Sequence, residues 1–266
     1  MSKSGIMIII PNGGTKIPEE FQPYSVVSDF ELLIFSDPYA NIIFNFQKAS
    51  AVVDSLISPL FIDMNADFRK LPPSYSNGVI KTETPNGKPV YDEIIKPDHI
   101  AVSNILKRYY FPFHESVKKI LSDEDIKLII ECRINPAVGF ANTPDRNKAM
   151  PLVRIKYVAD NSGKIYETAP RTLCDFIMAN LRESLKNEDC ACDEPFEVSE
   201  NEMRGEIAIK NSFRIPYISL ELSSSLYLNE NHFNPDFMKV DQIRIRKLND
   251  KIWNAVEKGA RRFGLI

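Results

Sequence analysis

Polar residues that could take part in chemistry follow the apolar runs of this chain. The turn Pro11-Asn12-Gly13-Gly14 comes directly after the run at residues 6–10, and Arg133 and Glu221 stand near the ends of two later runs. Open α/β sheets place ligands at the carboxyl ends of their strands, where glycine lets the backbone approach a ligand closely. The turn lacks the Gly-Lys-Ser/Thr ending of a Walker loop and is not a dinucleotide fingerprint, so a phosphate site has little support.

The elements that must position these residues alternate along the chain. Short apolar, β-branched runs predict buried strands, and the longer stretches between them have helical spacing. This alternation predicts a layered α/β fold with a largely parallel or mixed sheet. The predicted strands cover residues 6–10, 60–63, 127–132, 153–158 and 217–222.

Two helices lie in the middle of the sequence. One covers residues 97–121 and should kink or restart at Pro112, because proline removes an interior N–H and clashes with the preceding turn. The other begins near Pro170 and carries an apolar stripe of residues at helical spacing, namely Leu173, Phe176, Ile177, Leu181 and Leu185.

A third helix and a long loop complete the expected elements. The helix takes Asn234 as its cap and Pro235 in its first turn, runs to about residue 259, and buries the lone Trp253. The segment at residues 71–91 is rich in Pro, Gly, Asn and Thr, which form turns. It is either a lid over a site or a plain surface loop or hairpin.

Composition restricts the class of protein. With 266 residues, 44% of them hydrophobic, the chain can build one ordinary core, and we predict a single domain over residues 1–266. The net charge of −3, from 33 basic and 36 acidic residues, argues against a nucleic-acid partner. The apolar stretch at residues 6–10 is too short for a signal peptide or a membrane span, so we expect a cytoplasmic protein without a membrane partner.

Cysteine usage fits a reducing compartment. The chain has four cysteines, and only Cys190 and Cys192 are close in sequence, within an acidic segment. Two thiolates at this spacing could share a soft metal ion or form a redox pair, or they are simply free thiols on a surface loop.

Several short motifs resemble those of the N-formylglutamate amidohydrolase family. The family's Pro-His-x-Gly-x-x-x-Pro is matched at Pro11, Gly14 and Pro18, with Asn12 in the histidine position, and its Ser/Thr-Asp pair resembles Ser28-Asp29. Its Ser-Arg-x-x-x-Asp-x-Asn-Arg block keeps three residues and loses both arginines; the chain has Ser58, Pro59, Asp63, Asn65 and Ala66 at these positions.

The later motifs continue the same order. Residues 87–91 look like the family's Gly-x-Pro-x-Tyr, and residues 111–114, which end in His114, look like its Tyr-Pro-Tyr-His segment. The family's Asp-x-His-Ser is matched by Glu131-Cys132-Arg133-Ile134, so Arg133 stands in the position of the second metal-binding histidine. The ending around Glu221 resembles the family's Gln-x-Glu block, in which the glutamate is the candidate general base.

The resemblance implies a three-layer α/β/α sandwich with a mixed, mostly parallel sheet, a phosphorylase/hydrolase-like arrangement, and zinc as the family's cofactor. We nevertheless expect no metal ligands and no cofactor in this chain. An amide oxygen at Asn12 is a poor zinc ligand, and the fixed charge of Arg133 repels a dication. The remaining histidines, His99, His114 and His232, have no spacing that would put two of them on one face.

The candidate site follows from these matches. We expect Glu221 and Arg133 in catalytic positions, and a set of substrate-binding residues that meets them in one pocket, namely Asn12, Gly14, Asp29, Asp63, Asn65 and His114. Arg133 should pair with carboxylates that would otherwise face zinc, chiefly Glu221 and also Glu131 or Asp29. It either binds an acidic ligand or forms a buried ion pair that only keeps the pocket satisfied.

Two functions remain open at this point. One is a hydrolase that cleaves the C–N amide bond of an N-acyl acidic amino acid with altered ligands. The other is a catalytically inactive family member that binds an anionic small molecule. The retained Glu221 favours the first, and the replacement of two histidines by Asn12 and Arg133 favours the second.

Overall fold

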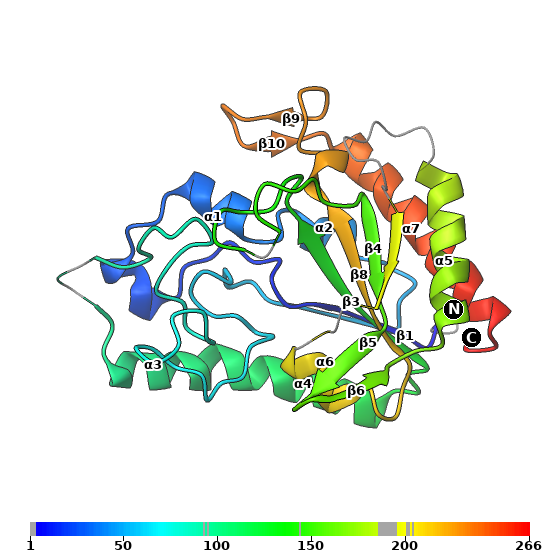
Figure 1. Cartoon of the computed structure of the whole chain (residues 1–266), viewed down its shortest axis with the longest axis horizontal. Coiled ribbons are helices and arrows are strands. Elements are labelled where there is room, and N and C mark those ends of the chain that lie inside the picture. The colour runs from blue at the N-terminus through cyan, green and yellow to red at the C-terminus, as the bar shows by residue number, and fades with distance from the viewer. Residues whose placement is uncertain are drawn as a thin grey trace.

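A six-stranded sheet lies at the centre of the computed structural model, which describes residues 4–92, 94, 96–143, 145–185, 196–200, 203 and 205–266 (Figure 1). The strands run in the order β2-β1-β3-β8-β4-β7. The first four are parallel to one another, whereas β4 runs antiparallel to β8 and β7 runs parallel to β4. The strands are β1 (Ile6–Ile10), β2 (Ala51–Asp54), β3 (Leu128–Asn135), β4 (Val153–Lys156), β7 (Phe196–Ser199) and β8 (Tyr217–Ser223).

Helices cover both faces of this sheet (Figure 1). Ile6 and Ile8 of β1 point into a core shared with α2 (Ala40–Ile43), α5 (Arg171–Leu185) and α7 (Gln242–Arg262). Met7 and Ile9 point into a second core on the other face. The helices of that face are α1 (Asp29–Phe35), α3 (His99–Ile105), α4 (Phe111–Asp123) and α6 (Glu206–Asn211). The predicted three-layer α/β/α sandwich with a mixed, mostly parallel sheet is thus confirmed.

Smaller elements decorate the sandwich. Two hairpins stand outside the main sheet, one formed by β5 (Val158–Asn161) and β6 (Lys164–Glu167), the other by β9 (Phe233–Asn234) and β10 (Lys239–Val240). Short helical turns of other types are η1 (Glu19–Tyr24), η2 (Leu106–Tyr110) and η3 (Ser224–Leu226). No helix within the described ranges is long and apolar enough to cross a bilayer.

Three of the predicted strands are confirmed, at β1, β3 and β8. The strand predicted at residues 60–63 is wrong, because the N–H groups of Phe61 and Ile62 donate to the Ser58 carbonyl and close a turn. This run is apolar because it is buried in the second core, not because it is extended. The strand predicted at residues 153–158 is split, since β4 ends at Lys156 and β5 begins at Val158.

The predicted restart at Pro112 is confirmed, and it takes a specific form. Between α3 and α4 the chain makes the π-helical turn η2, and Pro112 then lies in the first turn of α4. A π-helical turn changes the i→i−4 hydrogen-bond pattern just before the residue that has no N–H to donate. The helix predicted near Pro170 is also confirmed, as α5.

The predicted start of the last helix is wrong. Residues 233–240 form the β9–β10 hairpin, in which Asn234 Oδ1 accepts from Phe237 N at 3.2 Å. The cap of α7 is instead Asp241, whose Oδ1 accepts from Ile243 N at 2.8 Å. The helix also continues past Gly259 to Arg262, so Gly259 does not end it. A Cβ at Gly259 would lie 2.4 Å from Ile177 Cγ1, which shows that this glycine lets α7 approach α5 closely.

Trp253 is a core residue of α7, as predicted, with 5% of its surface exposed. Cys132 and Cys174 are buried free thiols, and burial raises the pKa of both. The pair Cys190 and Cys192 lies outside the described residues.

The cap of α7 can be tested by substitution. Asp241→Ala should lower the free energy of unfolding measurably, because it leaves an N-terminal N–H of the helix without its acceptor. Asn234→Ala should cost less, since Asn234 supports only the hairpin turn. Chemical denaturation of both variants measures the difference, and a larger loss for Asn234→Ala would contradict this assignment of the helix start.

Candidate functional site

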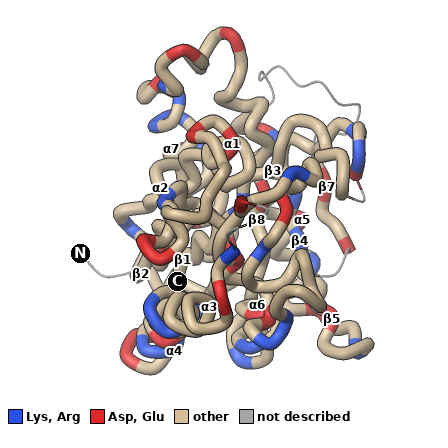
Figure 2. Tube along the Cα trace, turned by 90° about the vertical axis from the view of Figure 1, so that its left-hand side faces the viewer, with Lys and Arg blue, Asp and Glu red and all other residues tan. Residues whose placement is uncertain are grey.

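A cleft of 440 Å³ opens at the carboxyl ends of β1 and β3. Asn12 enters it from the turn after β1, Asp63 from the turn at residues 58–63, and Arg133 from the end of β3. Parallel strands bring Asn12 and Arg133 together because the carboxyl ends of β1 and β3 lie at the same edge of the sheet, and the turn at residues 58–63 adds Asp63. Figure 2 shows acidic and basic residues gathered around the ends of β3 and β8.

The guanidinium group of Arg133 lies between three oxygen groups. Its Nε donates to Asp37 Oδ2 at 2.8 Å, and its Nη1 lies 3.7 Å from Glu131 Oε1. The Asn12 amide satisfies both of its groups when its oxygen accepts from Arg133 Nη2 at 2.6 Å and its nitrogen donates to the Pro11 carbonyl. Each of the three guanidinium nitrogens therefore has a polar neighbour, but only Nε and Nη2 donate hydrogen bonds, because the Nη1–Glu131 distance is that of an ion pair.

The two carboxyl groups nearest Arg133 are buried and hard to ionise. Burial raises the pKa of Asp37 and of Glu131 above their usual values, although the Arg133 charge opposes the shift in each case. Glu131 also accepts hydrogen bonds from the Tyr217 hydroxyl and from Asn65 Nδ2. One cation is thus not enough to neutralise the carboxyl groups around it.

Asp63 is neutralised by a second cation. Lys81 Nζ lies 3.0 Å from Asp63 Oδ2, and both side chains are about one-fifth exposed (18% and 20%). Burial would raise the pKa of Asp63, but Lys81 and Arg133 together hold it below its usual value. Lys81 comes from the segment at residues 71–91, so that segment contributes to the wall of the cleft.

Glu221 has its own set of partners. Lys156 Nζ lies 2.7 Å from its Oε1, Asn135 Nδ2 donates to its Oε2 at 2.8 Å, and Arg154 Nη1 lies 3.6 Å away. Burial would raise the pKa of Glu221, but Lys156, Asn135 and Arg154 hold it below its usual value. The expected pair of Arg133 with Glu221 is therefore not the one that forms, although the two residues face each other across β3 and β8.

These residues do not fit a zinc ion. The two positions that match the family's metal histidines are in direct contact, but they hold a neutral amide and a permanently charged guanidinium. Within the described part of the chain, no group of three or more His, Cys, Asp or Glu side chains is placed to hold a metal ion. The positive charge in this part of the cleft comes from Arg133.

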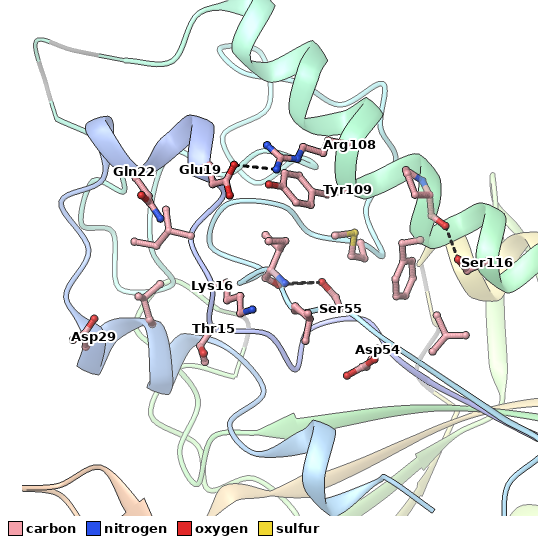
Figure 3. A pocket seen from close by; sticks show the side chains of 18 residues that line it. Thr15, Lys16, Glu19, Gln22, Asp29, Asp54, Ser55, Arg108, Tyr109 and Ser116 are labelled. Carbon is pink, nitrogen blue, oxygen red and sulfur yellow. Dashed lines mark hydrogen bonds and ion pairs between the residues drawn. The ribbon is translucent and has the colours of Figure 1, made fainter.

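Three predicted site residues lie elsewhere or act structurally. Asp29 is exposed at the start of α1, where it lines a different pocket of 940 Å³ together with Thr15 and Lys16 (Figure 3). Gly14 allows a close backbone approach, because a Cβ there would lie 2.1 Å from the Leu56 carbonyl carbon. His114 Nε2 bonds the Met64 carbonyl at 2.9 Å, and burial lowers the pKa of this histidine to about 4.

Asn65 contacts a residue of the site but does not line the cleft. Its Nδ2 donates to Glu131 Oε1 at 2.8 Å and its Oδ1 accepts from Ile207 N at 3.1 Å, so both ends of the amide are occupied. Asn65 therefore orients Glu131. A role of Asn65 in holding a substrate stays a prediction.

The sequence did not predict four residues that contact the charged side chains of the site: Asp37, Lys81, Asn135 and Lys156. Asp37 belongs to a second Ser-Asp pair, Ser36-Asp37, which follows Ser28-Asp29 by eight positions and was the available signal. Ser28 instead caps α1 in a capping box with Glu31, which explains why the first pair is a helix start. Lysines in a loop and an antiparallel strand carry no such signal.

Removing the central cation should destabilise the fold. Arg133→Ala should lower the free energy of unfolding at pH 7 by about 3 kcal/mol, the lower end of the range for a buried pair, because the guanidinium side chain is 29% exposed. Arg69→Ala, which removes a 73% exposed partner of Asp67, should change the free energy of unfolding little and serves as the control.

The pH dependence of this loss has a definite sign. Asp37 and Glu131 already have raised folded pKa values, and removing Arg133 raises them further, so their ionisation at neutral pH penalises the folded state more. At a pH below the carboxyl pKa values these groups are protonated and no longer need the cation. The difference between wild type and Arg133→Ala in urea denaturation should shrink as the pH falls from 7 towards 4, and a constant difference would contradict this account.

Comparison with known proteins agrees with the geometry. The structure is similar to the crystal structure of an N-formylglutamate amidohydrolase from Ralstonia eutropha JMP134, with a TM-score of 0.73, 15% identity, and 98% of this chain and 96% of that chain covered. It also resembles the crystal structure of a gene product from Agrobacterium tumefaciens, with a TM-score of 0.59, 15% identity, and 96% and 91% covered. At these identities the likeness shows the fold.

No curated protein matches the sequence. The family model described as N-formylglutamate amidohydrolase matches residues 4–228, which include every residue of the cleft discussed above. The chain therefore belongs to the N-formylglutamate amidohydrolase family.

Proposed function

We propose that this chain is a zinc-independent member of its family that binds a small carboxylic acid in the cleft without hydrolysing it. The observation that carries the proposal is the position of Arg133, whose guanidinium contacts Asn12, Asp37 and Glu131 where the family's metal histidines are matched. A dication beside this fixed charge is disfavoured, because at about 4 Å even two unit charges repel by about 4 kcal/mol at an effective dielectric near 20.

The state of Glu221 supports binding rather than hydrolysis. A general base works best when its pKa lies near the working pH. Lys156, Asn135 and Arg154 hold the pKa of Glu221 below its usual value and occupy both of its oxygens. A carboxylate in this setting is a weak base, and each of its oxygens already has a partner within the protein.

The cations of the cleft suggest an acidic ligand. Arg133 and Lys81 both line it, and both retain exposed surface, 29% and 18%. Both cations also lower the pKa of Asp63, and Lys81 is in direct contact with it. A ligand carboxylate could accept from both groups through charge-assisted hydrogen bonds.

Metal content tests the first half of this proposal. The purified protein should retain less than about 0.1 zinc per chain after dialysis against a weak chelator, because Arg133 disfavours the ion. The double variant Asn12→His with Arg133→His should take up zinc, since it places two imidazoles beside Asp37 and Glu131. Elemental analysis measures both. One zinc per wild-type chain, or formate release from N-formyl-L-glutamate by the wild type, would instead support an active hydrolase with altered ligands.

Ligand binding tests the second half. Lys81→Met should weaken the binding of N-formyl amino acids about tenfold, the effect of losing one charge-assisted hydrogen bond. Lys88→Met is the matched control, because Lys88 is 70% exposed and pairs with Glu31 outside the cleft. Isothermal titration calorimetry measures both, with thermal melts to confirm folding. If Lys81→Met and Lys88→Met bound N-formyl amino acids equally tightly, Lys81 would not be part of the ligand-binding site.

A further inference from the structure

The cleft has two chemically different parts. Its charged part holds Asn12, Asp37, Asp63, Lys81 and Arg133. The rest of the lining is mostly apolar or proline, apart from Ser36, Asn135 and Ser224. Its apolar residues include Ile34 and Phe35 of α1, Pro59 and Leu60 of the turn at residues 58–63, Phe140 of the chain after β3, and Leu228 after η3.

Aromatic residues give this apolar wall a fixed shape. Phe35 and Phe140 contact each other edge to face, with ring centroids 5.1 Å apart. Their contact joins α1 to the chain that follows β3. Edge-to-face rings are a favourable arrangement and present a rigid surface to an apolar group.

The charged part has no capacity for a second acidic group. Of the described residues that line the cleft, only Arg133 and Lys81 are cationic, and each already pairs with a carboxylate, Asp37 and Asp63 respectively. A ligand with one carboxylate can share these two cations. The second carboxylate of a dicarboxylic acid would have to lie against the apolar wall, where an ionised group without a partner is strongly disfavoured.

Pro59 contributes to the apolar wall of the cleft, in the same turn as Asp63. It lines the cleft next to Leu60, at the start of this turn at residues 58–63. Proline has no side-chain donor, so nothing at this position can hold a ligand carboxylate. A longer cationic side chain there would change the preference of the wall from apolar to acidic groups.

From this division we infer that the ligand of the cleft is a monocarboxylic acid with an apolar or aromatic body, such as an N-acyl derivative of an apolar amino acid, and not an acidic amino acid derivative. The inference rests on the proposed function, because it assumes that the cleft binds a carboxylate at Arg133 and Lys81. A volume of 440 Å³ suits a ligand of this size, within the usual range of about 300–1,000 Å³ for small-molecule sites.

A matched pair of ligands tests the inference directly. N-formyl-L-phenylalanine and N-formyl-L-glutamate carry the same formyl amide and α-carboxylate and differ only in the side chain. Calorimetric titration of the wild-type protein should give at least about tenfold tighter binding of the phenylalanine derivative, because the wall buries an apolar aromatic side chain and offers no cation to a second carboxylate.

Two variants locate the preference. Phe140→Ala should weaken binding of the phenylalanine derivative about tenfold and leave the glutamate derivative unchanged, because it removes part of the apolar wall alone. Phe213→Ala, at a residue that is 63% exposed and outside the cleft, is its control. Pro59→Arg should reverse the order of the two ligands, and Pro23→Arg, at an exposed proline of η1, should not.

The outcomes separate this inference from the proposed function. Tighter binding of N-formyl-L-glutamate to the wild type would overturn the inference and leave a carboxylate-binding cleft in place. Binding of neither ligand would overturn both. If Pro59→Arg fails to fold by circular dichroism, the Phe140→Ala comparison decides alone, and equal losses for both ligands in that variant would overturn the inference.

Discussion

The contact of Arg133 with Asn12, Asp37 and Glu131 is the interaction on which the rest of the site depends. It places a permanent cation among buried carboxyl groups, and this charge cannot be removed by a proton leaving. Everything nearby has to accommodate a planar, singly charged group with fixed donor directions. The amide at Asn12 fits because its oxygen accepts from a guanidinium N–H, which an N–H of a protonated histidine could not do.

One unit of positive charge leaves the neighbouring carboxyl groups only partly neutralised, and the structure distributes the remainder. Asp63 is paired with Lys81, and Glu221 with Lys156 and Arg154. Across the sheet, Arg133, Glu221, Arg154 and Glu197 lie at matching positions of β3, β8, β4 and β7, so the charges alternate in sign along one row. Such a row keeps each charge beside an opposite one without requiring a divalent ion.

The sequence predicts the sheet better than the site. The runs that form β1, β3 and β8 are buried on both faces and so read as continuous apolar stretches, which is why these strands were predicted. The residues at their ends, Asn12, Arg133 and Glu221, were identified through their match to the family motifs. The pairs Ser28-Asp29 and Ser36-Asp37 look alike in the sequence, because each places an aspartate after a serine, and only the fold shows that the first pair caps α1. Lys81 and Lys156 approach from a loop and an antiparallel strand, and contacts of that kind leave no spacing pattern to read.

Most residues that hold the three layers together are different from those that give the cleft its chemistry, and Arg133 contributes to both. The three layers are held by the two cores on either face of the sheet, and none of the charged residues of the cleft belongs to either core. Gly14, Asn65 and His114 match family motifs, yet their contacts are with the chain's own backbone and with Glu131, so they hold the strand ends in position. Residues of this kind preserve the shape of a cleft whatever lies in it. The identity of the ligand is then set by the few side chains that face the cleft, and here those provide one fixed cation, one lysine and an apolar wall.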